Sequence, residues 1–240
     1  MACSSVCLLV QCGSSFNVIT FEPVGILHSP YQRFYDAPRQ PGVDGIAEEL
    51  RVELYAHKNY EQALEDLSGC THIWLVVYFH RAEGWKPKVL PPRGRTKRGV
   101  FATRSPHRPN PIGITSCELV RVDGRNVYVR GTDLMDQTPV LDIKPYVAYA
   151  DAHPESRVDW IDGLEESVYA IEGGSRLANE LPADVARHVM SVLGADPLPH
   201  PYRRIECLDG EVYEIAVREY RVYYTLRDTT VTILRTHVVL

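Results

Sequence analysis

One seven-residue segment constrains the fold of this chain more than any other feature. Residues 73–79 read IWLVVYF, a run without charged side chains that is rich in β-branched and aromatic residues. Such a run is typical of a central strand buried on both faces. Helices do not alternate regularly with the strand-like segments around it, and no G-x-G-x-x-G follows a predicted strand. The pattern therefore argues against a Rossmann fold and favours a mostly β architecture, a barrel or sandwich with a few helices.

Turn and cap signals predict the other elements of this part. A helix is expected to begin after Asn59, which suits an N-cap, and to end at Gly69. Asp123 and Gly124 predict the turn of a β-hairpin. Further strands are expected at residues 21–28, 51–55, 114–122, 127–131 and 140–147.

A polar linker, residues 151–157, predicts a smaller C-terminal part. There Pro182 and Gly194 bracket a helical apolar pattern, and β-rich segments follow at residues 212–217, 220–227 and 231–239. We therefore expect three parts. They are a disordered leader at residues 1–20, a β-barrel domain at residues 21–152, and a small α+β domain, a helix plus a β-hairpin, at residues 153–240.

The six cysteines favour a reducing compartment. They include no C-x-x-C pair and no histidine cluster accompanies them, so no zinc or other metal site is expected. The leader lacks a basic segment before its short apolar run, which argues against a signal peptide. The apolar runs of the chain are too short to span a membrane. We expect a cytoplasmic protein.

Charge is distributed unevenly along the chain, whose net charge is −5. Residues 80–113 contain nine Lys or Arg and one acid, a charge of +8, whereas the rest holds 17 basic and 30 acidic residues. A local basic field on an acidic body indicates one anionic partner that docks there, although a solvated basic loop is the alternative. The nine are Arg81, Lys86, Lys88, Arg93, Arg95, Lys97, Arg98, Arg104 and Arg108.

The segment GVFATRSPHRPNPIG, residues 99–113, lies within this basic window. Its three prolines within six residues exclude a helix and make an interior strand improbable. Such a stiff loop presents groups suited to a phosphate, a carboxylate or a base edge. These groups belong to Arg104, Ser105, His107, Arg108 and Asn110. A second stiff loop, APRQPG, presents Arg39 and Gln40 between two prolines, and taken alone it is most simply a surface turn.

Two further groups could carry chemistry. His80 and Arg81 follow the apolar strand, where the floor of a pocket would lie, although a satisfied edge histidine explains His80 equally well. The segment DLMDQTPVLDIKPY places carboxylates near a lysine and a tyrosine. A structural ion pair is the usual explanation, but the density of carboxylates and prolines favours a site. Its members are Asp133, Asp136, Asp142, Lys144 and Tyr146.

In this order, these motifs resemble those of the TsaA/TrmO-type family of S-adenosylmethionine-dependent tRNA adenosine methyltransferases. The resemblance covers about residues 21–150. Two positions depart from the family pattern, because Gln137 stands where a glycine is usual and Leu198 where an arginine is common. The matching segments are VGILHSPY, PRQPG, FHR, WKPKV, PPR, GVFATRSPHRPNPIG and DLMDQTPVLDIKPY, with DPLPHPY in the C-terminal part.

The resemblance implies a small β-barrel that binds S-adenosylmethionine, partly at a homodimer contact. The implied substrate is tRNA carrying threonylcarbamoyl-adenosine next to the anticodon, with the methyl group transferred to N6. By position, the implied cofactor pocket consists of Pro38, Arg39, Gln40, His80, Arg81, Arg104, Ile114, Asp133, Leu134, Met135 and Asp136.

The residues themselves suggest roles in such a reaction. The cofactor already carries the reactive methyl group, so the protein mainly supplies position and electrostatic field. The attacking nitrogen must lose a proton, which Asp136 or Asp142 could accept, with Lys144 and Tyr146 positioning them. The basic segment would hold tRNA phosphates. The expected tRNA-binding residues are Lys86, Lys88, Arg93, Arg95, Lys97, Arg98, His107, Arg108 and Asn110.

Two other functions stay open at this point. One is a module that binds S-adenosylmethionine or RNA without turnover, for which Gln137 in place of glycine is the only indication. The other is a methyltransferase acting on another, small acceptor. The basic window argues against a small acceptor, because a small substrate needs no field of that extent.

Overall fold

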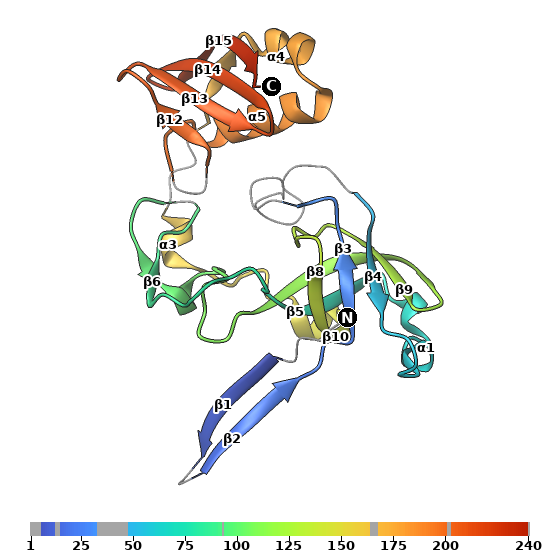
Figure 1. The fold of residues 1–240 in the computed structure, drawn as a ribbon. Helices are drawn as coiled ribbons and strands as arrows, with labels where there is room; N and C mark the ends of the chain where they lie inside the picture. Colours follow the sequence, from blue (N-terminus) through green and yellow to red (C-terminus); the bar gives the residue numbers. More distant parts are fainter. Residues whose placement is uncertain are drawn as a thin grey trace. The chain divides into compact units, whose positions relative to one another are not determined.

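A computed structural model describes residues 6–12, 15–32, 48–92, 94–163, 168–200 and 203–239. These residues divide into two compact units, with the division after Ser156. This division lies four residues after the boundary expected from the sequence. Each unit has its own sheet and its own apolar core (Figure 1).

Six strands of the first unit form a closed antiparallel barrel in the order β10–β3–β4–β9–β8–β5. Strand β10 closes it, because it pairs with β3 on one side and with β5 on the other. The barrel confirms the prediction of a mostly β fold. The strands are β3 (Gly25–His28), β4 (Leu50–Leu54), β5 (His72–Tyr78), β8 (Ile112–Asp123), β9 (Asn126–Arg130) and β10 (Thr138–Pro145).

Alternate residues of each strand fill the barrel. In β5, Ile73, Leu75 and Val77 have no exposed surface, whereas the residues between them are half-buried. This corrects the expectation that the segment is buried on both faces. A barrel is one closed sheet, so each strand turns only one face to the interior.

The leader, residues 1–20, was expected to be disordered, and its described residues lie in two strands. Strand β1 (Val6–Cys12) pairs antiparallel with β2 (Ser15–Phe21) along their full lengths. Both segments are seven residues long, and β2 is rich in β-branched and aromatic residues, which favours strand pairing. The strand predicted at residues 21–28 is accordingly split between β2 and β3.

Short elements connect the barrel strands. The predicted helix after Asn59 is shorter than expected, because Asp66 has a positive φ of 65° and interrupts it. The segment forms α1 (Tyr60–Ala63) and a 3-10 turn, η1 (Leu67–Gly69). Between β5 and β8 lie β6 (Lys88–Val89), β7 (Arg98–Gly99) and a second 3-10 turn, η2 (Val100–Ala102). Helix α2 (Ala148–Asp151) follows β10.

The second unit is a five-stranded sheet in the order β11–β15–β14–β13–β12, with helices packed against it. The predicted helix is present as α5, with Pro182 at its N-cap. Strands β11 and β12 and helix α4 were not predicted. The elements are α3 (Asp159–Asp162), β11 (Ala170–Glu172), α4 (Gly174–Glu180), α5 (Ala183–Ala195), β12 (Ile205–Cys207), β13 (Val212–Val217), β14 (Tyr220–Arg227) and β15 (Thr230–Val238).

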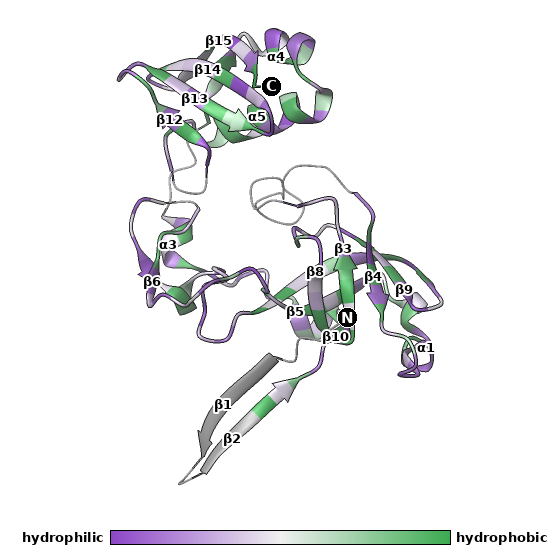
Figure 2. Ribbon diagram, in the orientation of Figure 1, coloured by the Kyte–Doolittle hydropathy of each residue, from purple (hydrophilic) through white to green (hydrophobic). Residues whose placement is uncertain are grey.

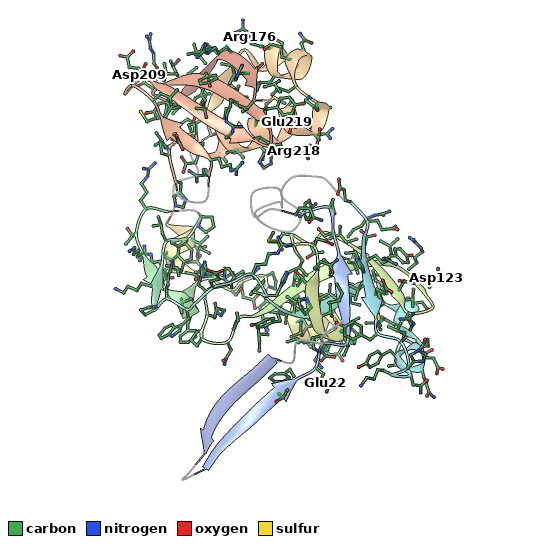
Figure 3. All side chains as sticks on the ribbon, in the orientation of Figure 1. Glu22, Asp123, Arg176, Asp209, Arg218 and Glu219 are labelled. Atoms are coloured by element: carbon green, nitrogen blue, oxygen red, sulfur yellow. The ribbon has the colours of Figure 1, made fainter. Side chains whose placement is uncertain are left out.

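The apolar stripe of α5 and the inner face of the sheet form the core of this unit (Figure 2). Val189 of α5 and Val222 and Tyr224 of β14 have no exposed surface, and the Tyr224 hydroxyl donates to the carbonyl of Pro197. At the β13–β14 turn, Arg218, labelled in Figure 3, forms an ion pair of 2.8 Å with Asp184. In the part of the chain that the structure describes, no helix is long and apolar enough to cross a membrane.

The contact between β3 and β4 leaves no room for a side chain at Gly25. A Cβ built there would lie 2.4 Å from the carbonyl oxygen of Glu53. We therefore expect Gly25→Ala to lower the free energy of unfolding by about 1–3 kcal/mol, because the backbone of β4 must shift. Urea unfolding followed by far-UV circular dichroism measures this loss. Gly69→Ala is the matched control, since a Cβ there meets nothing within 4 Å, and an equal effect of both changes would contradict the prediction.

Candidate functional site

Loops that are distant in sequence meet at one rim of the barrel. Because β10 is antiparallel to both of its neighbours, the start of β10 lies beside the ends of β3 and β5. Strand β8 begins at the same rim, since Ile112 pairs with Tyr78. The loops at these strand ends are residues 29–32, 79–82, 99–111 and 131–137. Most of the residues expected in the cofactor pocket lie on these loops.

Asp136 ties two of the loops together. Its Oδ1 accepts a hydrogen bond of 3.0 Å from the backbone N–H of Ser29, and its Oδ2 accepts one of 3.0 Å from Nε2 of Gln32. Its own N–H donates to the carbonyl of Tyr31 at 3.0 Å. Partial burial raises the pKa of Asp136, but the hydrogen bonds to its carboxylate outweigh burial and leave the pKa below its ordinary value. The carboxylate is therefore ionised at neutral pH.

Arg81 connects the loop after β5 to the same place. Its Nη1 donates to the carbonyl of Gln32 at 2.6 Å, and its Nε donates to Nε2 of His80 at 3.2 Å. Burial and then the charge of Arg81 lower the pKa of His80, more than the carboxylate of Asp136 raises it. His80 is thus a neutral imidazole whose Nε2 is held as an acceptor.

Asp133 differs from Asp136 in its surroundings. Burial raises the pKa of Asp133, and the hydrogen bond with its own backbone and the charge of nearby Arg104 only partly offset this. The segment around it is well anchored, with Leu134 6 % exposed and the Thr138 hydroxyl donating to the carbonyl of Met135 at 2.7 Å. The rim therefore holds two carboxylates with pKa values shifted in opposite directions, a pattern found at functional sites.

These groups fit S-adenosylmethionine, which carries a carboxylate, an ammonium, a sulfonium, ribose hydroxyls and a base. The guanidinium groups of Arg81 and Arg104 can bind a carboxylate, and Asp133 and Asp136 can face positive charge or hydroxyls. Within the residues that the structure describes, Nδ1 of His107 is buried without a hydrogen-bond partner. A buried polar atom of this kind can be satisfied by a bound ligand.

Asp142, Lys144 and Tyr146 lie away from this rim. Lys144 forms an ion pair of 2.7 Å with Asp142 on the outer face of β10. The N–H of Tyr146 donates to the carbonyl of His72 at 3.0 Å, at the end of β5 opposite to Tyr78. The structure therefore does not bring these three expected catalytic residues together with Asp136 at the rim. The pairing of β10 with β5 is the physical reason. It places Asp142 opposite Val76 and Lys144 opposite Trp74, at increasing distance from the rim loops.

Ile114 also lies apart from the rim loops. It pairs with Val76 on the outer face of the barrel and is 65 % exposed. Four other expected site residues lie outside the described residues: Pro38, Arg39, Gln40 and Arg93.

The basic segment forms a structured surface beside this rim, which we call the basic platform, residues 85–89 and 98–108. Strands β6 and β7 pair within it, and the N–H of Val100 donates to the carbonyl of Pro87 at 3.0 Å. The N–H of Lys86 donates to the carbonyl of His107 at 3.2 Å. Arg108 was expected to bind tRNA, but its Nη1 donates to the carbonyls of Val100 and Thr103, at 3.1 and 2.8 Å. Its guanidinium thus helps to hold the platform together.

Sequence analysis missed Ser29, Tyr31 and Gln32 as members of the site. Ser29 and Tyr31 belong to the matched segment VGILHSPY, and Gln32 follows it directly. That motif was the available signal. The backbone groups of Ser29 and Tyr31 make the contacts with Asp136, so side-chain chemistry alone did not mark them.

The backbone conformation at Gln137 is one that glycine adopts more readily than other residues. Its φ is +63°, in the left-handed region, and its N–H donates to the carbonyl of Leu27 at 2.9 Å. Its side-chain Nε2 lies 3.4 Å from Nδ1 of His28 and donates to Oδ2 of Asp136 at 3.4 Å. The chain therefore keeps the backbone conformation of the motif at some conformational cost.

Comparison with known proteins places these features in a family. The model of the tRNA-methyltransferase O N-terminal domain matches residues 26–152. The tRNA (adenine(37)-N6)-methyltransferase of Escherichia coli is 34 % identical over 229 residues, 90 % of this chain and 95 % of the relative. A putative S-adenosylmethionine-dependent methyltransferase, RcsF, of Pseudomonas aeruginosa is 37 % identical over 193 residues, 74 % of this chain and 80 % of the relative.

Comparison with solved structures points to the same family. The crystal structure of TrmO from Pseudomonas aeruginosa superposes with a TM-score of 0.60 at 29 % identity, covering 94 % of this chain and all of that one. The fold and the rim define a β-barrel protein built to bind a charged cofactor, distinct from Rossmann-type enzymes. The chain belongs to the tRNA-methyltransferase O family.

The positive φ at Gln137 generates a prediction. Gln137→Gly relieves the left-handed strain, whereas Gln137→Ala keeps the strain and also removes the amide contacts. We expect the glycine variant to exceed the alanine variant in unfolding free energy by about 1 kcal/mol. Urea unfolding of the two variants measures the difference. Equal stability of the two would show that the strain is absent in solution.

Proposed function

We propose that this chain is an S-adenosylmethionine-dependent methyltransferase that modifies N6 of an adenosine in tRNA. The acceptor is threonylcarbamoyl-adenosine next to the anticodon. One observation carries the proposal. Carboxylate and guanidinium groups lie together at one rim of the barrel, and the basic platform lies beside them. Membership of the family supports the reaction class.

When bound, S-adenosylmethionine supplies an electrophilic methyl group on a cationic sulfur. The residues of this chain would bind and orient it: Arg81 and Arg104 would hold its carboxylate, and Asp133 and Asp136 would interact with its positive charges or hydroxyls. The neutral His80 keeps its Nε2 bonded to Arg81 and so fixes the guanidinium. The target base lies in an anticodon loop, where leaving the stack costs little.

Asp136 is the proposed proton acceptor. A carbamoyl-linked nitrogen becomes strongly acidic once it forms a fourth bond, so even a carboxylate of lowered pKa can take its proton. The ionised state of Asp136, secured by Ser29 and Gln32, provides that acceptor at neutral pH. The lowered pKa also means that this capacity persists well below pH 7, because the carboxylate is protonated only when the pH falls below that pKa.

The proposal includes a homodimer that acts in the cytoplasm. Ile114, 65 % exposed on the outer face of β8, supports a subunit contact at that face of the barrel. Cys70, Cys117 and Cys207 are free thiols, and burial raises the pKa of Cys117 to about 12, which makes it unreactive. Reduced cysteines and a tRNA substrate both fit that compartment.

Nucleoside mass spectrometry tests the reaction. tRNA that carries threonylcarbamoyl-adenosine is incubated with the protein, with and without S-adenosylmethionine. We expect a gain of one methyl group on that nucleoside only when the cofactor is present. If cofactor binding is confirmed and no methylated nucleoside forms, the chain is a binding module or uses another acceptor.

Asp136→Asn should lower kcat by about 100-fold or more, because general-base removal costs about 10²–10⁴-fold. Asp142→Asn is the matched control, and since it only breaks an exposed ion pair we expect activity within about twofold of the wild type. Single-turnover methylation at saturating cofactor measures both. Normal turnover by Asp136→Asn would remove Asp136 from the role of proton acceptor.

Ile114→Asp should convert the protein to a monomer, because a charge on an apolar contact remains unpaired. Sedimentation velocity measures the change. Tyr149→Asp is the control, since Tyr149 is also exposed, at 94 %, but lies on α2. An unchanged sedimentation coefficient for Ile114→Asp would show that this face is not the subunit contact.

A further inference from the structure

The basic platform is rigid. Its two segments are joined by the β6–β7 pairing, by the hydrogen bond from the Val100 N–H to the carbonyl of Pro87 and by the one from the Lys86 N–H to the carbonyl of His107. Val89 and Val100 anchor it from below, at 5 % and 2 % exposed. The Thr103 hydroxyl also donates to the carbonyl of Val100 at 2.9 Å. A surface held in this way loses little entropy when it binds a ligand.

Four cations of the platform and its edge are not neutralised by acidic side chains of the described residues. Among the described residues, Lys86, Lys88, Arg95 and Lys97 form no ion pair with an acidic side chain. Elsewhere such pairs are frequent, for example Arg121 with Glu49 at 2.5 Å and Arg203 with Asp196 at 2.5 Å. These four cations are therefore available to a polyanion.

Two large aromatic side chains are exposed on this surface. Trp85 is 55 % exposed and Phe101 is 76 % exposed. They lie on adjoining segments, because Pro87 and Val100, near each of them, are hydrogen-bonded to each other. The guanidinium of Arg108 lies 5.6 Å from the centroid of the Phe101 ring, and the carbonyls of Val100 and Thr103 hold it in place. The ring of Phe101 is thus presented on a fixed support.

We propose that Trp85 and Phe101 stack on unpaired bases of the tRNA anticodon loop and thereby select a single-stranded loop as the substrate. This inference rests on the proposed function and names the residues that read the substrate. Exposed aromatics among free cations are the arrangement that binds single-stranded nucleic acid, since each base offers a flat face and each phosphate a charge. Bases inside an A-form helix are already stacked and cannot use these rings.

Binding of a fluorescent anticodon stem-loop RNA tests the proposal. We expect Phe101→Ala and Trp85→Ala each to weaken binding by about 5- to 150-fold, the range of one lost base stack. Phe101→Trp and Trp85→Phe should restore most of the affinity because they keep a flat ring. Tyr149→Ala is the control, an aromatic that is 94 % exposed but outside the platform. A blunt-ended duplex RNA should bind the wild type and the alanine variants equally.

Salt dependence separates stacking from charge. Lys88→Ala should lower the slope of log K against log salt by about 0.7, the value for one phosphate contact on a single strand. Phe101→Ala should lower the affinity at every salt concentration and leave that slope unchanged. A changed slope in Phe101→Ala would mean that it acts by disturbing the cations, and the stacking role would be lost.

Two further results would overturn the proposal. If Phe101→Ala dissociates a dimer in sedimentation velocity, the exposed rings are a contact with a second copy of the chain. If it raises KM for S-adenosylmethionine and leaves the stem-loop affinity unchanged, the ring belongs to the cofactor site. Because the stem-loop assay needs no turnover, failure of the proposed methylation shows only in the nucleoside measurement and is distinguished from failure of this inference.

Discussion

The pairing of β10 with both β3 and β5 is the constraint on which the functional rim depends. It closes the barrel, and it fixes which loops share an edge. Because both pairings are antiparallel, the loop before β10 meets the loops after β3 and β5 at one place. The carboxylate of Asp136 then completes the junction by accepting hydrogen bonds from Ser29 and Gln32. The junction of the rim loops and the proposed proton transfer therefore both depend on the Asp136 side chain.

The distribution of charge distinguishes two regions at this rim, each suited to a different ligand. The rim loops hold charges of both signs at close range, with the pKa values of Asp133 and Asp136 shifted in opposite directions. The basic platform carries mainly one sign, and four cations at the platform and its edge form no ion pair with an acidic side chain among the described residues. A zwitterionic, sulfonium-bearing cofactor suits the first arrangement, and a polyanion suits the second. The same barrel edge presents both.

The backbone conformation at residue 137 shows how the chain accommodates Gln137 where a glycine is usual. Gln137 replaces a glycine in the D-L-x-D-G-T-P motif, yet its φ of +63° keeps the conformation that glycine adopts readily. Its side-chain amide contacts His28 and Asp136. The motif is therefore conserved here as a backbone shape, and the hydrogen bonds of Asp136 survive the substitution.

The sequence by itself determined the mostly β fold, the hairpin turn at Asp123 and Gly124, helix α5 and the location of the basic segment. Local alternation, turn chemistry and charge are written in neighbouring residues, so they can be predicted. Only the tertiary structure decided that Asp136 meets Ser29 while Asp142 and Tyr146 do not. Strand register, a long-range property, makes that choice. It also decided that Arg108 supports the platform, since the carbonyls it binds are placed by the folded loop.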